Sequence, residues 1–499
     1  MGKSEKNRIA RGIALYTVVT YIGQFISLVK TFLVAKFLAP IDLGVVGKAQ
    51  IIFDYSQYMN LGATYAFDVR YPMLRGEGNV NAAARIRTIA LKINAICGFL
   101  LLIFGIVIYF VRPTFIQEMN DLAIIIGMFS GLQVVMLSYR SILRAMELYN
   151  PFSTANLIFQ VFILAFVLLV GSDLTPALLF ISMSASALLT IIYSIHSLSS
   201  ESVTAVFVQQ GEIKKFLFLG ASLLTTQFAV FVMLSTDRVV GSFILSPAQF
   251  GLFTFAYLTV KASAVLTSSI STIIYPVVLR RYSSLKEKAL FFPIMERINI
   301  VITVFNSVLL VIFLSIIPFL VNLFLPNYVD SMPYIALMIP TLFFTGLPVS
   351  CADLLFAQGK QKTVLIVAVI ATVFSVCMFS IFQWLLLLEL YAVPVITISA
   401  SAAYGILIFI ISYRIFIGMK NSIKSLIRVF VIFIIGCLSY GFSFAVIAFF
   451  IGFKFTMYGW ESIIVMVMSV TFYFAVIYVA DRSAISILLV ELKHLLQKQ

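Results

Sequence analysis

Long hydrophobic segments alternate with short polar ones along the whole chain. Most of these segments hold about 20 residues or more, which is the length that an α-helix needs to cross a bilayer. The pattern therefore predicts an all-α polytopic membrane protein with 14 transmembrane helices. The predicted spans are residues 12–36, 43–68, 89–111, 121–143, 153–171, 174–197, 214–241, 247–279, 297–321, 332–356, 363–388, 392–416, 427–452 and 461–480.

The second predicted span carries a polar stripe that is unusual for a lipid-facing helix. On a helical wheel of 100° per residue the stripe consists of Gln50, Asp54, Gln57, Leu61, Thr64 and Asp68. An acidic side chain near the middle of a membrane is costly unless it faces a bundle interior or a water-filled cavity. We therefore expect Asp54 and Gln57 to contact substrate, and Asp54 and Asp68 to act in ion coupling or gating.

A related pattern recurs in the second half of the chain. Pro40 and Gly44 form a P-x-x-x-G motif that is repeated, at one constant offset, as Pro247 and Gly251. Six predicted spans per copy give both copies the same orientation, as in parallel repeats. The expected organisation is two pseudo-symmetric six-helix lobes, 1–197 with spans 1–6 and 213–417 with spans 7–12, followed by spans 13 and 14 in 424–482 and a cytoplasmic amphipathic tail in 483–499. A short frayed tail is the equal alternative for the last segment.

The second copy of the stripe is centred on a cation. Shifted by the same offset, the first stripe falls on Tyr257, Lys261, Ala264, Ser268, Ser271 and Tyr275. Lys261 is then the counterpart of Asp54, and charged residues at such depth are functional candidates. We expect Lys261, Tyr257 and Tyr275 to bind substrate. The alternative is that each charge pairs with a neighbour and only fixes helix packing.

Spans 1 and 7 also carry polar positions. Gln24 lies on a polar stripe of span 1 with Lys30 at its edge, and span 7 has the pair Asp237-Arg238. Arg238, Lys30 and Gln24 are further substrate-binding candidates, and Asp237 is an ion-coupling candidate. Two alternatives are that Lys30 snorkels to the outer surface and that Asp237 only neutralises a nearby cation.

Composition and charge support this assignment. The chain is 62% hydrophobic and 11% charged, with a mean hydropathy of +1.09, which excludes an ordinary soluble protein. Its net charge of +14 does not predict nucleic-acid binding, because the basic residues lie in loops on one side of the predicted membrane. With both termini in the cytoplasm, only Lys36, Arg112 and Lys454 fall outside, which follows the positive-inside rule.

Signals of enzymatic or metal chemistry are lacking in the sequence. There is no Walker loop and no loop large enough to hold a glycosyltransferase or polymerase site. Both histidines lie at predicted helix ends and the four cysteines lie in apolar segments. We therefore expect a transporter without a metal site, a cofactor or an enzymatic activity.

The chain resembles the polysaccharide (O-antigen or exopolysaccharide) flippases of the multidrug/oligosaccharidyl-lipid/polysaccharide exporter (MOP) superfamily. The resemblance covers nearly the whole chain and depends on the order of four motifs: FLAPIDLGVVG, NLGATYAFDVR, STDRVVGSFILSPAQFGLFTFAY and FAQGKQK. It implies an inner-membrane protein that moves a polyprenyl-pyrophosphate-linked oligosaccharide from the inner to the outer leaflet by alternating access. It also implies proton or sodium coupling, contact with membrane lipids and a polysaccharide polymerase as a partner.

Within this resemblance, Arg238 and Lys261 are expected to bind the anionic headgroup, and Asp54 to contact sugar hydroxyls or to gate. Asp237 resembles the acid in span 7 of sodium-binding relatives, which carry a second acid in span 11 that this chain lacks. A lipid II flippase and a multidrug or cation antiporter of the same superfamily are the alternatives. An integral-membrane glycosyltransferase or polymerase is the alternative from another class.

Overall fold

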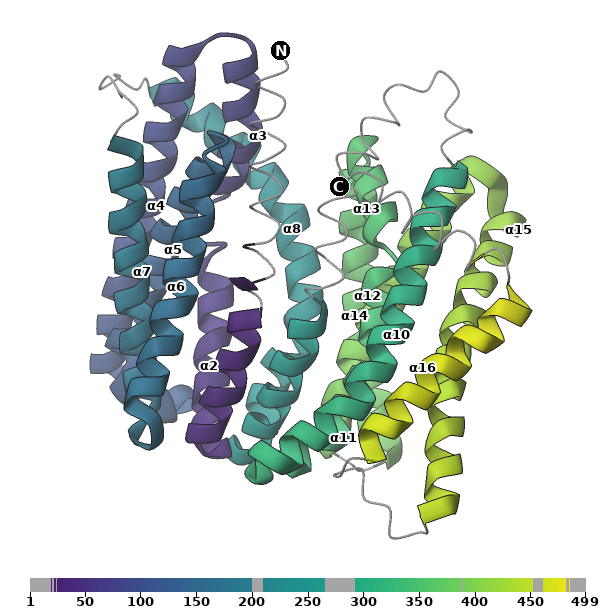
Figure 1. Ribbon diagram of the computed structural model, residues 1–499. Helices are drawn as coiled ribbons and strands as arrows, with labels where there is room; N and C mark the ends of the chain where they lie inside the picture. Colours follow the sequence, from purple (N-terminus) through teal and green to yellow (C-terminus); the bar gives the residue numbers. More distant parts are fainter. Residues whose placement is uncertain are drawn as a thin grey trace. The chain divides into compact units, whose positions relative to one another are not determined.

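The computed structural model describes residues 19, 22–23, 25–199, 210–264, 292–386, 389–451, 461–481 and 484. Every regular element in these segments is a helix (Figure 1). The chain divides into two compact units. Unit 1 is Met1–Phe228 with Ser246–Thr254, and unit 2 is Ala229–Leu245 with Phe255–Gln499.

Unit 1 is a bundle of helices joined by short turns, and residues 25–37 and 247–254 are also helical in it. Its elements are α2 (Pro40–Ser56), α3 (Ala63–Gly76), α4 (Val80–Val111), η1 (Thr114–Leu122), α5 (Ala123–Ala145), α6 (Tyr149–Val170), η2 (Gly171–Asp173), α7 (Pro176–Ser199) and the first part of α8 (Gln210–Ile244). Helices α4 and α5 approach each other closely at Gly98 and Gly131. A Cβ added at Gly98 would lie only 2.7 Å from the carbonyl oxygen of Gly131. Small residues allow such contacts between membrane helices, where the hydrophobic effect gives little drive for association.

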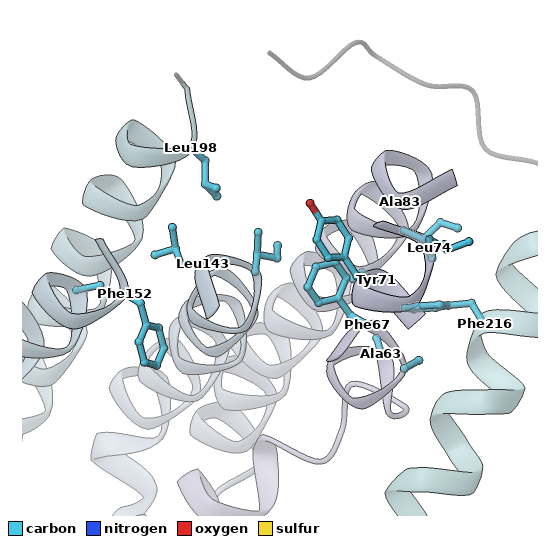
Figure 2. Close-up of a cluster of buried hydrophobic side chains, with 14 residues drawn as sticks. Ala63, Phe67, Tyr71, Leu74, Ala83, Leu143, Phe152, Leu198 and Phe216 are labelled. Carbon is cyan, nitrogen blue, oxygen red and sulfur yellow. The ribbon is translucent and has the colours of Figure 1, made fainter. Parts of the chain in front are cut away.

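A cluster of buried apolar side chains holds one end of unit 1 together. Figure 2 shows Phe67 and Tyr71 of α3 side by side, with ring centroids 4.8 Å apart. Leu143 of α5 and Phe216 of α8 belong to the same cluster. Helices α3 to α8 all contribute to it, so this cluster fixes the position of α3 independently of α2.

The two copies of the P-x-x-x-G motif lie against each other in unit 1. A Cβ at Gly44 would overlap the carbonyl oxygen of Pro247, and a Cβ at Gly251 would overlap that of Pro40 and lie 3.1 Å from the Gly44 nitrogen. One turn further, a Cβ at Gly47 would overlap the hydroxyl of Thr254. The contacts are reciprocal, because the glycine of each motif lies against the proline carbonyl of the other motif.

Unit 2 contains the second part of α8, the helical residues 255–264 and a further set of helices. These are α10 (Phe292–Phe324), η4 (Pro326–Ser331), α11 (Met332–Met338), α12 (Thr341–Gly346), α13 (Val349–Ala357), α14 (Gln361–Leu386), α15 (Glu389–Ile451) and α16 (Glu461–Ala480). Helix α15 is two helices that meet at a kink at Gly418, where φ is 74°. The predicted loop between spans 12 and 13 is therefore a sharp bend with helix on both sides.

The last helix is held to unit 2 by an apolar cluster and by ion pairs. Tyr473 and Ile477 of α16 pack with Ile300 of α10 in a buried cluster. Arg428 of α15 donates to both carboxylate oxygens of Asp481, at 2.6 and 3.0 Å, and to Glu296 of α10 at 3.1 Å. One guanidinium thus links three segments of unit 2.

Ten helices in the described part of the chain are long and apolar enough to cross a membrane, or eleven if a pair bent by 45° counts as one span. The protein is therefore an all-α, multi-pass membrane protein, but the predicted count of 14 spans is not confirmed. Predicted spans 12–36 and 247–279 extend outside the described residues. The ten helices are Val80–Val111, Gln117–Ala145, Tyr149–Asp173, Pro176–Ser199, Gly211–Ile244, Met295–Phe324, Gln361–Trp384, Tyr391–Ile415, Ile417–Phe449 and Glu461–Ala480, and the bent pair is Pro326–Met338 with Thr341–Phe356.

The prediction of one continuous helix over residues 43–68 is wrong, because α2 ends at Ser56 and α3 begins at Ala63. In the turn between them Leu61 and Gly62 have φ of 54° and 78°. The Gly62 N–H donates to the side-chain oxygen of Asn60 at 3.1 Å. Asparagine side chains that bond to a nearby backbone N–H compete with helical hydrogen bonding, which is the physical reason for the break.

Candidate functional site

The candidate site in unit 2 begins with two adjacent charged residues of α8. Asp237 and Arg238 are only 1% and 5% exposed. The Asp237 carboxylate accepts hydrogen bonds from the hydroxyl of Thr397 on α15 and from the backbone N–H of Arg238, the latter at 2.7 Å. A buried carboxylate requires such partners, since leaving it unsatisfied is expensive.

The Arg238 side chain lies over an aromatic ring. Its Cζ is 4.4 Å from the ring centroid of Tyr257, and the Nζ of Lys261 is 5.5 Å from the same centroid. Both distances are within the range of a cation–π interaction. Tyr257 and Lys261 are four residues apart on one helix and share a face. The structure thus brings together three residues that the sequence predicted as substrate-binding: Arg238, Tyr257 and Lys261.

Unit 1 holds a further candidate cation, Lys30, which is partly buried. The Nζ of Lys30 donates to the side-chain oxygen of Gln160 on α6 at 2.8 Å. Lys30 is partly buried, and this hydrogen bond directs its ammonium at another helix of the same unit. Gln160 was not singled out from the sequence, although a glutamine in an otherwise apolar segment is a usable signal.

The predicted polar stripe of the second span is divided by the break in that span. Gln50 and Asp54 remain on α2 and Gln57 is its C-cap residue. The Gln57 side-chain amide donates to the backbone oxygen of Asp54 at 2.8 Å. Because α3 starts anew at Ala63, the helical wheel does not relate Asp54 to Thr64 or to any later residue.

Around the break, a buried polar network joins α3 to α4. The Asn60 amide donates to the Thr64 hydroxyl at 2.9 Å and to the side-chain oxygen of Asn94 at 3.2 Å. The Asn94 amide donates to the backbone oxygen of Ala90 at 2.8 Å. Neither asparagine was predicted as important, yet an Asn-x-Gly sequence and an asparagine within an apolar span are both visible in the sequence.

Asp68 on α3 has partners on α5. Its carboxylate forms an ion pair with Arg144 at 2.6 Å and accepts a hydrogen bond from the Ser141 hydroxyl. These contacts connect α3 to the end of α5. The coupling or gating role of Asp68 stays a prediction.

Two predicted substrate-binding residues, Gln24 and Tyr275, lie outside the described residues. Within the described part of the chain, no group of three or more His, Cys, Asp or Glu residues could hold a metal ion.

Comparison with known proteins gives no match to a protein-family model or to a curated protein. Solved structures do match. The lipid II flippase MurJ in an inward closed conformation aligns with a TM-score of 0.68 at 16% identity, over 95% of this chain and 100% of that chain. A multidrug resistance MATE family transporter of the MOP superfamily, in an inward-facing conformation, aligns with a TM-score of 0.64 at 16% identity, over 80% of this chain and 96% of that chain.

An outward-facing MATE family transporter also aligns, with a TM-score of 0.57 at 17% identity, over 81% of this chain and 96% of that chain. The structures that this fold resembles thus include both inward- and outward-facing conformations. At these identities the likeness concerns the fold. The chain has the fold of the MOP-superfamily transporters and flippases.

Proposed function

We propose that the protein is a flippase that moves a polyprenyl-pyrophosphate-linked oligosaccharide from the inner to the outer leaflet of the plasma membrane by alternating access. In this proposal both termini are cytoplasmic, and the fold of known flippases and transporters supports a transport role over an enzymatic one. Fold alone does not determine function, so the substrate class is argued from the residues.

The observation that carries the proposal is the pair of cations gathered on the Tyr257 ring. Cations inside a membrane protein are costly and mark substrate or ion pathways. A guanidinium binds phosphate through two parallel hydrogen bonds, whereas an ammonium acts as a compact point charge. A pyrophosphate has the negative charge density and the several acceptor oxygens that such a pair would bind.

The remaining candidate residues take supporting roles in the proposal. Asp54 and Gln57 contact sugar hydroxyls, and Asp54 also gates. Lys30, held by Gln160, offers a further cation to an anionic substrate, and Gln24 and Tyr275 complete the polar lining. Asp237 couples transport to a proton or a sodium ion, with the Thr397 hydroxyl as a second oxygen.

The proposal is tested by deleting the gene and identifying which lipid-linked glycan accumulates on the inner leaflet. Arg238→Ala and Lys261→Ala should each fail to restore transport while remaining inserted and abundant. A hydrogen bond to a charged group contributes about 1.5–3 kcal/mol, so we expect roughly a 10- to 150-fold loss of substrate affinity. Retention of cationic dyes without accumulation of any glycan would instead identify a drug antiporter.

A lipid II flippase is the second candidate, because the alignment with MurJ covers nearly all of both chains. Lipid II also contains a polyprenyl pyrophosphate, so the cation pair of Arg238 and Lys261 would suit lipid II as well as a lipid-linked oligosaccharide. The two are separated by expressing the protein in cells depleted of their own lipid II flippase. Rescue of growth would favour lipid II, and absence of rescue together with an accumulated oligosaccharide would favour the first proposal.

A further inference from the structure

We infer that Tyr55, Tyr58 and Phe228 form an aromatic platform on which a sugar ring of the substrate stacks, with Asp54 and Gln57 beside it to bind sugar hydroxyls. All five residues belong to unit 1. The inference rests on the proposed function and names the surface that receives the saccharide. None of the three rings was singled out from the sequence, because the platform forms from contacts across the break in the second predicted span.

The platform joins the end of α2 and the turn after it to α8. The ring centroid of Phe228 lies 5.4 Å from that of Tyr58 and 6.1 Å from that of Tyr55, both in edge-to-face geometry. About two turns earlier on α8, Gly220 lies so close to Gly62 that a Cβ at Gly62 would overlap its backbone. Helix α8 therefore meets the second span at two separate points, which fixes Phe228 relative to both tyrosines.

The break in the second span indicates that this face of unit 1 is hydrated. The Asn60 side chain bonds to Asn94 at 3.2 Å, and both residues lie inside predicted spans, so the turn lies at membrane depth. The turn is not buried in the protein, since Met59 and Leu61 are 54% and 56% exposed. Non-helical backbone would leave polar groups unsatisfied in lipid, so at this depth it occurs only where it is buried in protein or borders water. An exposed turn here therefore borders water.

Aromatic rings beside polar groups at a hydrated surface suit a carbohydrate. One face of a pyranose consists of C–H groups, which the negative face of an aromatic ring attracts. Tyr55 and Tyr58 are partly exposed and Phe228 is 37% exposed. Asp54 interacts electrostatically with Tyr58, so its carboxylate lies beside the platform. A carboxylate accepts several hydrogen bonds at once, so bonds within the protein leave it able to accept one from a sugar hydroxyl.

An organic cation is the other ligand that aromatic rings and an acid bind. The two ligands differ in their need for neutral hydrogen-bonding groups. The platform has such groups in the hydroxyls of Tyr55 and Tyr58 and in the side chain of Gln57. A sugar uses them, whereas a fully alkylated ammonium has no hydroxyl to bond to them. The composition of the site therefore favours a sugar.

The platform can be tested by saturation-transfer difference NMR on the purified full-length protein in phospholipid nanodiscs, which contain no sugar detergent. The probes are free glucose, galactose, rhamnose and N-acetylglucosamine. At least one should receive saturation at its ring C–H protons from wild type and from Phe228→Trp, which keeps an aromatic ring. Its affinity should fall about 2- to 13-fold in Phe228→Leu, which keeps only an apolar side chain. The matched control, Phe110→Leu, removes a ring from another edge-to-face pair, with Tyr109 at 5.5 Å, and should bind as wild type does.

The acid is tested in the same assay. Asp54→Asn should weaken sugar binding about 5- to 13-fold, because an amide forms weaker hydrogen bonds than a carboxylate. The inference is overturned if Phe228→Leu binds the sugars as tightly as wild type, or if wild type binds none of them. Preferential binding of tetramethylammonium, lost in Asp54→Asn, would assign the site to organic cations and overturn it too.

The proposed function is judged separately from the platform. If sugars bind with the expected pattern but the deletion strain accumulates no lipid-linked glycan, the proposed function is wrong while the platform stands. If the glycan accumulates but Phe228→Leu binds sugars as wild type does, the platform is wrong while the proposed function stands.

Discussion

The crossing of the two P-x-x-x-G motifs predicts that Gly251→Ala destabilises the protein although alanine is the better helix former. A Cβ at this position would overlap the carbonyl oxygen of Pro40 and lie 3.1 Å from the Gly44 nitrogen. Both are backbone atoms, so no change of rotamer can relieve the contact and the two helices must move apart. Overpacking of this kind typically costs about 1–3 kcal/mol.

The control for this variant is Gly441→Ala on α15, where a Cβ would meet nothing within 4 Å. Both variants gain about 1 kcal/mol of helix propensity, so the difference between them isolates the cost of the contact. For a unit of this size, 1 kcal/mol corresponds to roughly 2–4 °C in Tm. Gly251→Ala should therefore unfold about 2–12 °C below Gly441→Ala when both are heated in the same detergent and followed by tyrosine fluorescence.

A double variant strengthens the test. Gly44→Ala at the facing position should also destabilise, since its Cβ would overlap the carbonyl oxygen of Pro247. Once one substitution has separated the helices, the second meets less resistance, so the combined loss should be smaller than the sum of the two. Strict additivity, or a Gly251→Ala protein as stable as Gly441→Ala, would show that the helices do not pack through these glycines.

Three further predictions follow from contacts within single units. Arg428→Gln should lower the free energy of unfolding by about 1–3 kcal/mol, because it breaks the bonds to two carboxylates. The control is Lys424→Gln, which changes an exposed side chain and should leave the free energy of unfolding unchanged. Hydrogen exchange at the backbone amides of α16 should be faster in Arg428→Gln than in the control. Gly62→Ala should reduce the yield of folded protein far more than Gly78→Ala, since both have positive φ but only Gly62 lies against another backbone. Thr397→Val should alter the dependence of transport on the coupling ion while Thr397→Ser restores it, because only the valine variant removes the hydroxyl bonded to the buried aspartate of α8.

The helices that sequence analysis located best are those defined by a long apolar run. Predicted spans 174–197 and 461–480 correspond closely to α7, Pro176–Ser199, and α16, Glu461–Ala480. The reason is that a bilayer requires every backbone polar group to be satisfied internally, so a sufficiently long apolar segment has to be helical. Hydrophobic length alone therefore predicts such elements.

The second span was mispredicted for a local reason. A helical wheel assumes a constant 100° per residue and contains no information about a turn. In this turn the backbone N–H of Gly62 donates to the side chain of Asn60, only two residues earlier in the sequence. The turn is then completed by Gly62, whose position against Gly220 leaves no space for a side chain. The sequence signal was present, but the wheel does not use it.

The sequence singled out the candidate residues one by one, whereas it did not predict their contacts. Arg238 and Lys261 were selected because charge in an apolar segment is costly. The charged residues Asp237 and Lys30 bond to Thr397 and Gln160, which lie more than a hundred residues away in the sequence. Hydrophobic periodicity shows which face of a helix is polar, but the identity of the facing helix depends on packing of the whole unit.

The two copies of the predicted repeat differ in side-chain chemistry beyond the point where their P-x-x-x-G motifs meet. At the crossing, Gly44 and Gly251 occupy equivalent positions and both must lack a side chain, because each lies against the other copy. About two to three turns further along, the same offset pairs Gln50 with Tyr257 and Asp54 with Lys261. The close backbone contact at Gly44 and Gly251 does not restrict the size of the side chains at these later positions, so the two copies can carry different residues there. The second copy carries an aromatic ring with two cations near it, and the first carries an acid. Substitutions at the glycines of the crossing should therefore change stability. Substitutions at Asp54 and Lys261 should instead change transport.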